Sequence, residues 1–492
     1  MKYDFKKWNA FYPYLILFLG TIIVLLTSPL APFANKLTGA DSGVYIYCSE
    51  QILKGKIIYK ELFDHKGPLL YLINMAGLVI GGGNTVGIWF VELVLLFGAL
   101  IYIYKSATLY FDKFIALISS LSCLLLFFPL FGRGNITEEY VVPFISVSLY
   151  YFLHFFKYRS INKYHFAIIA FCCTCAFLLK PNFISLWIIG YLSILIILLK
   201  DKRSKEMFSI SLVSLAAFFA ACLPFAVYFS YTDSWADFKF CFWDFNKAYS
   251  DVSISGVLLR TCRRFWYAGH FWLSRIGRVH VILFIFIGVV YFKHLIHKVE
   301  TFFIFFAIIL TNLMISIGSY DFLNYYVPFV PLFGIPYALS YYLFVKKLRV
   351  SPKLIICVIF LLFGYGCFRQ MKDVYSRYIP MENLLSFITE NSEKTDKITV
   401  VGHDCSIYTL SGRESVSKYS YQFPIIEVKQ YEAMIAERYM NDLAEGKPCI
   451  VLTRIPSSAY EPYFKNLNDF LDTNYEKVIT TDPNYHYWLL KH

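Results

Sequence analysis

The feature that most restricts how this chain can fold is a series of apolar segments, each suited to crossing a lipid bilayer. A helix rises ~1.5 Å per residue and the hydrocarbon core is ~30 Å thick, so a span needs roughly 20 mostly apolar residues. Hydrophobic residues make up 58% of the 492 residues, and charged residues only 16%. The sequence therefore predicts an α-helical polytopic membrane protein with about 11 transmembrane helices.

The predicted spans follow one another through the first three quarters of the chain. They are Phe11–Pro32, Val86–Tyr104, Phe114–Phe131, Val141–Phe156, Phe166–Leu179, Phe183–Leu199, Met207–Phe229, Val279–Phe292, Phe302–Ile317, Val327–Val345 and Leu354–Phe368. The fifth and the eighth are short, so the count is open by one pair.

Lysine and arginine residues gather in every second turn between these spans, which indicates the cytoplasmic side of the membrane. The basic groups lie in the N-terminal tail and in three turns: Lys2, Lys6 and Lys7; Lys157, Arg159 and Lys163; Lys200, Lys202 and Arg203; Lys346, Lys347 and Arg349. We therefore expect a multi-pass protein of the cell membrane with a cytoplasmic N-terminus. The net charge of +12 reflects these turns, and we expect no nucleic-acid partner.

The composition changes near Met381, where the long apolar runs give way to runs of strand length. Ile398–Val401, Cys449–Leu452 and Trp488–Leu490 are predicted strands, and Val428–Leu443 has the apolar spacing of a helix. We predict two domains. Residues 1–371 form the transmembrane domain, with a first outer loop at 34–85 and a long outer loop at 230–278. Residues 381–492 form a small extracytoplasmic α/β domain.

The stretch from Ala40 to Asn74, in the first outer loop, is too polar to span a bilayer yet contains many Tyr, Leu and Ile residues. This mixture is typical of a loop that lies on the membrane surface. Asp41 follows the first span closely, and Tyr45 comes one helical turn later. An isolated Asp at this position would more often be a cap on a helix that begins near Gly43.

The same stretch ends in Asp64, His65 and Lys66, an acid, a titratable base and a cation in consecutive positions before Gly67 and Pro68. A single His is more often structural, and a single Lys usually extends its charge toward water. Three such groups together are harder to explain by packing. We therefore interpret Asp41 and this triplet as a candidate site.

Further charged residues occur in the other outer turns. Glu138 and Glu139 follow Arg133 in the loop after the third span; they are either solvated or bind sugar hydroxyls or a divalent ion, and Arg133 could pair with a phosphate. Arg260, Arg263 and Arg264 have the spacing that puts them on one side of a helix. Arginine favours phosphate because its planar group donates two parallel hydrogen bonds, and anionic lipid headgroups are the alternative ligand.

Four other side chains lie near the membrane boundary, and three of them have two interpretations each. Lys180 either reaches the interface or binds phosphate. Glu92 lies inside a span, where a charge is costly, and we expect it to pair with an outer-loop Arg. Tyr325 and Tyr326 either belong to the aromatic belt of the interface or stack on a sugar.

Two short motifs, Ala-Asp-Ser-x-x-Tyr at 40–45 and Phe-Asp-His-Lys-Gly-Pro-Leu-x-Tyr at 63–71, resemble the glycosyltransferases of the GT-C fold. The resemblance is greatest to the bacterial branch that includes the aminoarabinose transferase of lipid A and the protein O-mannosyltransferases (glycosyltransferase family 39-like). It also covers the Glu-bearing loop after the third span, the Tyr-Tyr-x-Pro run at 325–328 and the outer tail.

This resemblance implies transfer of a sugar from a polyprenyl-phosphate donor to an acceptor on the outer side of the membrane. Asp41 would be the general base or the electrostatic partner for the acceptor hydroxyl, and Lys66 would bind the donor phosphate. Ser42 stands where the family often has a second acid, and Gly67 separates Lys66 from Pro68. The metal requirement is therefore open: no cofactor is certain, and a divalent cation is the alternative.

The residue types suit this chemistry. Displacing a lipid phosphate from an anomeric carbon needs a base at the incoming hydroxyl and cations at the leaving phosphate. The acceptor is an envelope polysaccharide, a lipid or a protein. The competing hypotheses are a flippase for a lipid-linked sugar or another envelope-polysaccharide transporter, and a non-catalytic envelope scaffold. Transporters usually have repeated halves and mid-bilayer polar residues, whereas this sequence concentrates its charges in the outer loops.

Overall fold

The computed structural model describes residues 11–34, 40–130, 134–250, 253–263, 298–318, 322–376, 381–422, 426–454, 464, 466–480 and 482–491. Helices dominate the chain up to Glu390, and the named strands lie between Lys397 and Leu490.

The helical part consists of the following elements: α1 (Tyr12–Leu25), α2 (Ala40–Leu53), α3 (Pro68–Ile80), α4 (Val86–Thr108), α5 (Lys113–Leu125), α6 (Phe127–Leu130), α7 (Thr137–Tyr158), α8 (Lys163–Leu179), η2 (Pro181–Phe183), α9 (Ser185–Lys200), α10 (Ser204–Tyr231), α11 (Trp235–Lys239), η3 (Phe240–Asp244), α12 (Phe245–Tyr249), α15 (Lys298–Ile315), η4 (Leu323–Phe333), α16 (Gly334–Lys346) and α17 (Pro352–Ser376). Residues 254–263 are also helical. The remainder consists of α18 (Glu382–Glu390), β1 (Lys397–Val401), α19 (Ser406–Ser411), β2 (Glu414–Ser415), α21 (Lys429–Gly446), β3 (Ile450–Arg454), α22 (Leu467–Asn474), β4 (Tyr475–Val478) and β5 (Tyr485–Leu490).

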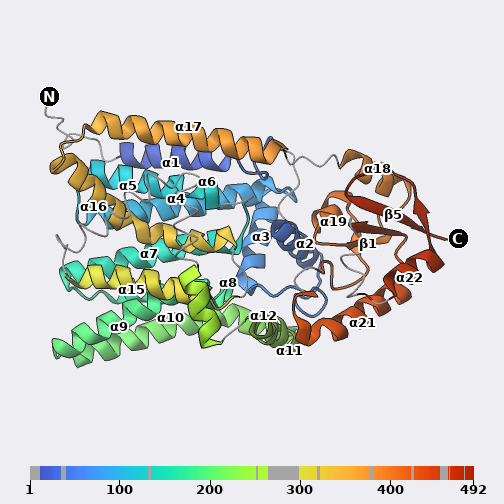
Figure 1. Cartoon of the computed structure of the whole chain (residues 1–492). Coiled ribbons are helices and arrows are strands. Elements are labelled where there is room, and N and C mark those ends of the chain that lie inside the picture. Colours follow the sequence, from blue (N-terminus) through green and yellow to red (C-terminus); the bar gives the residue numbers. More distant parts are fainter. Residues whose placement is uncertain are drawn as a thin grey trace.

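The long helices lie side by side, and residues 381–491, which we call the sheet region, cover one end of them (Figure 1). Within the described residues, five helical segments are long and apolar enough to cross a membrane: Val86–Thr108, Thr137–Tyr158, Ser204–Tyr231, Leu323–Lys346 and Pro352–Lys372. Helices α10 and α17 leave apolar side chains such as Phe208, Phe219 and Phe360 exposed. A bilayer would cover such surfaces, and the protein is a multi-pass membrane protein.

The predicted spans overlap helices wherever the structure describes them, as Met207–Phe229 does with α10. Val279–Phe292 lies outside the described residues, and the total of about 11 spans stays a prediction. The expected span Val327–Val345 is not a continuous α-helix. It begins in the 3-10 helix η4 and becomes α-helical at Gly334, because Pro328 and Pro331 lack the N–H groups that an α-helix needs.

The stretch from Ala40 to Asn74 is not the surface loop that its composition predicted. It contains α2 and the start of α3, joined by a connection at 54–67 that packs among other elements. Helix α2 buries residues on all of its sides, including Tyr45, Tyr47 and Cys48, because it lies between the helical part and the sheet region. Asp41 is in the first turn of α2, so it does not cap a helix that begins at Gly43.

The sheet region is built on five strands in the order β2-β1-β3-β5-β4. Strand β1 pairs in parallel with β2 and β3, and β5 pairs antiparallel with β3 and β4. Helix α2 meets this region at α19, where a Cβ atom on Gly43 would lie 2.5 Å from the hydroxyl oxygen of Ser406. The glycine thus permits the close approach that brings the end of β1 next to Asp41.

Candidate active site

A cavity of about 1070 Å³ lies where the helical part meets the sheet region. The start of α2, the end of the 54–67 connection, the end of α8, α12 and η4 all contribute to its wall. Its charged and titratable lining residues are Asp41, His65, Lys66, Glu138, Lys180, Lys247, Tyr249, Tyr325 and His403. The remaining wall is largely apolar and includes Leu130, Phe177, Phe242, Met314 and Phe322.

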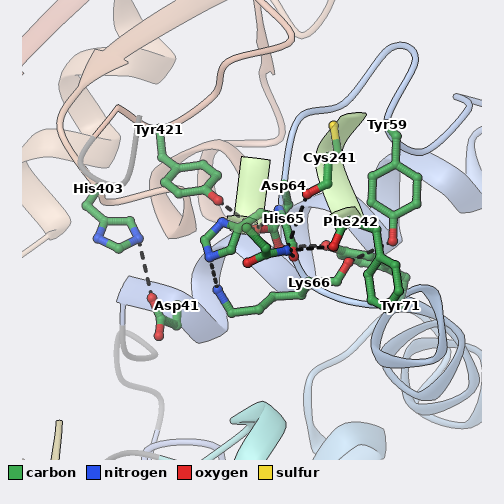
Figure 2. Close-up of polar contacts among 11 residues, drawn as sticks. Asp41, Tyr59, Asp64, His65, Lys66, Tyr71, Cys241, Phe242, His403 and Tyr421 are labelled. Atoms are coloured by element: carbon green, nitrogen blue, oxygen red, sulfur yellow. Dashed lines mark hydrogen bonds and ion pairs between the residues drawn. The ribbon is translucent and has the colours of Figure 1, made fainter. Parts of the chain in front are cut away.

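Asp41 is the exposed carboxylate of this cavity, with 47% of its side chain accessible. Its Oδ1 atom is 3.5 Å from Nε2 of His403, a residue that follows β1 (Figure 2). Asp41 is in the first turn of α2, where the free N–H groups of a helix interact favourably with an acidic side chain. It is therefore an accessible carboxylate at the cavity wall.

Lys66 and His65 are paired with each other at the cavity wall. Nζ of Lys66 is 2.8 Å from Nε2 of His65. An ammonium group can only donate, so Nε2 accepts and the proton of the imidazole is on Nδ1. Burial lowers the pKa of His65 well below its ordinary value, and Lys66, Lys180 and His403 lower it further. His65 is thus neutral near pH 7, and the positive charge of the pair belongs to Lys66.

Three backbone contacts hold Lys66 in place. The hydroxyl of Tyr59 donates to the carbonyl oxygen of Lys66 at 2.7 Å, and the side-chain amide of Asn246 donates to that of His65 at 2.7 Å. The N–H of Gly67 donates to the carbonyl of Leu179 at 3.1 Å. A Cβ atom on residue 67 would overlap the carbonyl of Leu178. Glycine is needed here because the connection lies directly against the end of α8.

Asp64 faces away from the cavity and is fully buried. Its Oδ2 atom accepts from the hydroxyl of Tyr71 at 2.6 Å, and Oδ1 accepts from the hydroxyl of Tyr421 at 2.6 Å and from the N–H of His65 at 2.7 Å. Nδ1 of His65 is 3.4 Å from Oδ1 but makes no hydrogen bond with it. We expected Asp64 to bind substrate; the structure shows instead that it joins the connection to α3 and to the sheet region (Figure 2).

Lys180 and Glu138 form a second charged group on the cavity wall. Nζ of Lys180 is 3.2 Å from Oε1 of Glu138 and 4.2 Å from the centre of the Tyr325 ring. Oε2 of Glu138 accepts from the amide of Asn324 at 3.0 Å. Burial acts to lower the pKa of Lys180, but Tyr325 and Glu138 outweigh it and raise the pKa above its ordinary value. Lys180 is a charged residue of the cavity rather than one that reaches for the membrane interface.

Glu139 lies beside Glu92 and does not line the cavity. Both carboxyl groups are buried, and Oε1 of Glu92 accepts from the backbone N–H of Asn135 at 2.5 Å. The expected ion pair between Glu92 and an outer-loop Arg is absent among the described residues. The Asn135 side chain also bonds Ser42 at 3.0 Å and Asn74 at 2.8 Å, so this network joins α2, α3, α4 and the start of α7. Asn135 thus holds these elements together, and the predicted role of Glu139 stays a prediction.

The remaining predicted site residues are dispersed. Tyr45 is buried, with Nζ of Lys66 6.0 Å above its ring. Tyr326 packs on Phe329 rather than in the cavity wall. Arg260 donates from Nε to the carbonyl of Ser316 at 2.7 Å, and Arg263 is exposed on the same helix, residues 254–263. Arg133 and Arg264 lie outside the described residues.

Sequence reasoning missed His403, Lys247 and Asn246, all of which line the cavity. No local sequence pattern distinguishes these three residues. His403 directly follows a predicted strand, Ile398–Val401, and the carboxyl end of a parallel strand is a common place for functional residues. That position was the one available signal. Among the described residues, no group of three or more His, Cys, Asp or Glu side chains could hold a metal ion, and a divalent cation stays a prediction.

Comparisons with known proteins show which chains have a similar fold. Residues 65–229 match the model of the dolichyl-phosphate-mannose-protein mannosyltransferase family. The structure of ArnT from Cupriavidus metallidurans bound to undecaprenyl phosphate is similar over 98% of both chains, with a TM-score of 0.65 and 11% identity. The oligosaccharyltransferase AglB from Archaeoglobus fulgidus, in complex with an inhibitory peptide and a dolichol-phosphate, is similar over 98% of this chain and 74% of its own, with a TM-score of 0.55 and 13% identity.

A search among curated protein sequences found no match. The chain has the fold of ArnT and AglB, which are GT-C glycosyltransferases. The resemblance to the protein O-mannosyltransferases and to the GT-C fold, inferred from the motifs at 40–45 and 63–71, is confirmed.

Proposed function

We propose that this protein is an integral membrane glycosyltransferase that moves a sugar from a polyprenyl-phosphate donor to an acceptor on the outer side of the cytoplasmic membrane. The acceptor is an envelope polysaccharide, a lipid or a protein. The observation that carries the proposal is the cavity of about 1070 Å³, which is lined by an accessible carboxylate and by three ammonium groups. The solved structures named above contain polyprenyl phosphates, which supports a donor of that class for the same fold.

In the proposed reaction, the acceptor oxygen forms a bond to the anomeric carbon of the sugar while the bond from that carbon to the phosphate oxygen breaks. The electron pair of the broken bond stays on the phosphate. Asp41 takes the proton of the acceptor hydroxyl. Lys66 and Lys180 stabilise the charge that grows on the phosphate, because ammonium groups in a site shielded from water act strongly on nearby anions.

The charges within the cavity fit an anionic ligand. The charge of Lys180 is balanced by Glu138 at 3.2 Å. Lys66 has the neutral His65 as its nearest partner, and Lys247 is exposed at the wall. Asp41 is the other carboxylate on the wall. Lys66 thus has charge available for a phosphate, and we assign it the main contact.

The test measures release of undecaprenyl phosphate from a panel of radiolabelled undecaprenyl-phosphate hexoses and pentoses by the protein in liposomes, with envelope polysaccharide, lipid and protein supplied as acceptors. Replacing Asp41 by Asn should reduce turnover roughly 10²- to 10⁴-fold, the usual contribution of a general base, with unchanged binding of undecaprenyl phosphate. Asp233→Asn is the matched control, because this acid lies at the same end of the helices but does not line the cavity. Undiminished turnover in the Asp41 variant would refute the assignment.

The competing function is tested in the same liposomes. A flippase would move the labelled lipid across the membrane without releasing undecaprenyl phosphate, and the Asp41 variant would leave that movement intact. Translocation without transfer for every donor tried would refute the glycosyltransferase proposal.

A further inference from the structure

We propose that His403, supplied by the sheet region, is a positioning residue that orients Asp41 for catalysis. The inference rests on the proposed function, because it concerns the same carboxylate. Among the described residues that line the cavity, His403 is the only one from the sheet region. Its Nε2 atom is 3.5 Å from Oδ1 of Asp41.

The imidazole of His403 is held by the sheet region itself. The preceding residue, Gly402, donates its N–H to Oε1 of Gln422 at 2.7 Å and accepts from the N–H of Gln422 at 3.1 Å. The ring of His403 stacks on Tyr421, with centroids 5.1 Å apart and planes 14° from parallel. The hydroxyl of Tyr421 is in turn bonded to Asp64. The position of the imidazole is therefore set by contacts independent of Asp41.

The charges around His403 favour a neutral ring that donates to Asp41. The side chain is 14% accessible. Burial lowers the pKa of His403 below its ordinary value, and although Asp41, Asp404 and Asp64 act to raise it and Lys66 to lower it, burial prevails. At 3.5 Å, Nε2 of His403 faces Oδ1 of Asp41 but makes no hydrogen bond with it. A neutral imidazole with its proton on Nε2 donates to Oδ1 once the two atoms move closer, and catalytic contacts often shorten in this way in the substrate complex.

This contact leaves one oxygen of Asp41 for the reaction. Asp41 is in the first turn of a helix and half exposed, so without a partner its carboxylate would rotate among several rotamers. With Oδ1 held by His403, Oδ2 is the oxygen that takes the proton of the acceptor hydroxyl. His403 neither gains nor loses a proton in the step, and its contribution is orientation.

Two substitutions distinguish the effect of the Nε2 atom of His403 from the effect of its stacked ring. His403→Phe keeps the stacking on Tyr421 but removes Nε2, whereas His403→Gln loses the ring but retains an amide N–H near the same place. We expect the Phe variant to lower kcat roughly tenfold to a hundredfold, with unchanged KM for the donor, and the Gln variant to recover most of the loss. His486→Gln, in β5 of the sheet region and outside the cavity wall, is the control and should match the parent protein.

A Phe variant as active as the parent protein would overturn the proposal. So would equal losses in the Phe and Gln variants, since that result would assign the effect to packing.

A second measurement does not depend on the proposed function. A water-soluble carbodiimide labels protonated carboxyl groups, and labelling of Asp41 can be followed by mass spectrometry of the whole protein in detergent. Because Nε2 of His403 faces Oδ1 of Asp41, its removal leaves both carboxyl oxygens open to the reagent, so labelling should be faster in the Phe variant and close to the parent rate in the Gln variant. Equal rates in all three proteins would overturn the inference, whereas absence of transfer by the parent protein would refute the proposed function alone.

Discussion

At the scale of single residues, the lysines that line the cavity differ in whether a neighbouring carboxylate balances their charge. Lys66 has a neutral histidine as its neighbour, whereas Lys180 is paired with Glu138. We predict that Lys66→Ala weakens the binding of undecaprenyl phosphate roughly tenfold or more, since a hydrogen bond to a charged group contributes about 1.5–3 kcal/mol. Titration of the purified protein with the lipid measures this change.

The matched control is Lys60→Ala. Lys60 belongs to the same connection, but its ammonium group donates to the backbone carbonyls of Thr232 and Asp233 outside the cavity wall. Its removal should leave binding within about twofold of the parent value, given that exposed charges contribute little. Equal weakening by both substitutions would contradict a specific role for Lys66.

The lowered pKa of His65 predicts that the protein loses stability in acid. Its folded-state pKa lies below the ordinary value, so the unfolded chain binds more protons between that pKa and about 6.5, and stability falls as the pH drops through this window. The effect has at most the slope of one proton, about 1.4 kcal/mol per pH unit. Apparent melting temperatures of the parent and of His65→Gln, measured from pH 8 to pH 5, should differ in slope, with the shallower slope in the variant. Parallel curves would contradict this assignment.

Residue types alone did not reveal the different roles of Asp64, His65 and Lys66. The sequence correctly marked the triplet as unusual, and two of its members line the cavity. Asp64 turned out to be a buried acceptor for two tyrosines, one of which is 357 positions away. A partner at such a distance leaves no local pattern, so a structural carboxylate and a functional one look alike in the sequence. His403 was missed for the same reason, because the residue that it faces, Asp41, is also far away in the sequence.

At the scale of elements, the end of α8 and the 54–67 connection bring Lys66 and Lys180 to one wall. The contact between these two elements depends on Gly67. Its φ of −73° and ψ of 155° suit any residue, so glycine is needed only because a side chain would not fit against α8. We predict that Gly67→Ala destabilises the protein by about 1–3 kcal/mol, as overpacking usually does, and also weakens binding of undecaprenyl phosphate. Thermal unfolding and lipid titration of the same preparation test both effects.

Gly98→Ala serves as the control within the helical part. A Cβ atom on residue 98 of α4 would meet no atom within 4 Å, so alanine should be neutral or slightly stabilising there. If the Gly67 variant behaved like the Gly98 variant, the close contact with α8 would not hold the connection in place.

The helical elements were largely predictable, because long apolar runs leave few alternatives in a bilayer. Helix α4 begins at Val86 as expected, and α8 ends at Leu179. The stretch that contains α2 and the start of α3 was predicted to lie on the membrane surface because polar residues in it suggested contact with water, whereas protein groups satisfy them. Ser49, for example, donates to the carbonyl of Tyr71 at 3.3 Å. Polarity in the sequence does not distinguish contact with solvent from contact with another element.

At the scale of the whole molecule, the turns between α7 and α8, between α9 and α10 and between α16 and α17 lie at the end opposite the sheet region (Figure 1). These turns hold Arg159, Lys202, Arg203 and Arg349. The positive-inside rule therefore places the sheet region outside the cell, and we keep this orientation as a proposal.

A pair of cysteine substitutions at the two ends of α10 tests the orientation. Asp233→Cys should react with a membrane-impermeant maleimide in intact cells, and Lys202→Cys only after permeabilisation, each measured against the labelling of the parent protein. Residues 202 and 233 flank the same helix, Ser204–Tyr231, so the two variants differ only in the side of the membrane that they report. The reverse pattern would invert the topology and refute an outward-facing cavity.

The bond between Tyr421 and Asp64 has a consequence for how the protein is made. During synthesis Asp64 leaves the ribosome long before Tyr421, and until then Tyr71 and the adjacent backbone N–H are its only partners among those described. A buried carboxylate that lacks one of its partners is costly, so the first connection should stay hydrated until the last part of the chain has crossed the membrane and folded. The site would thus be completed at the end of biogenesis, and a chain interrupted before Tyr421 would be inserted in the membrane but inactive.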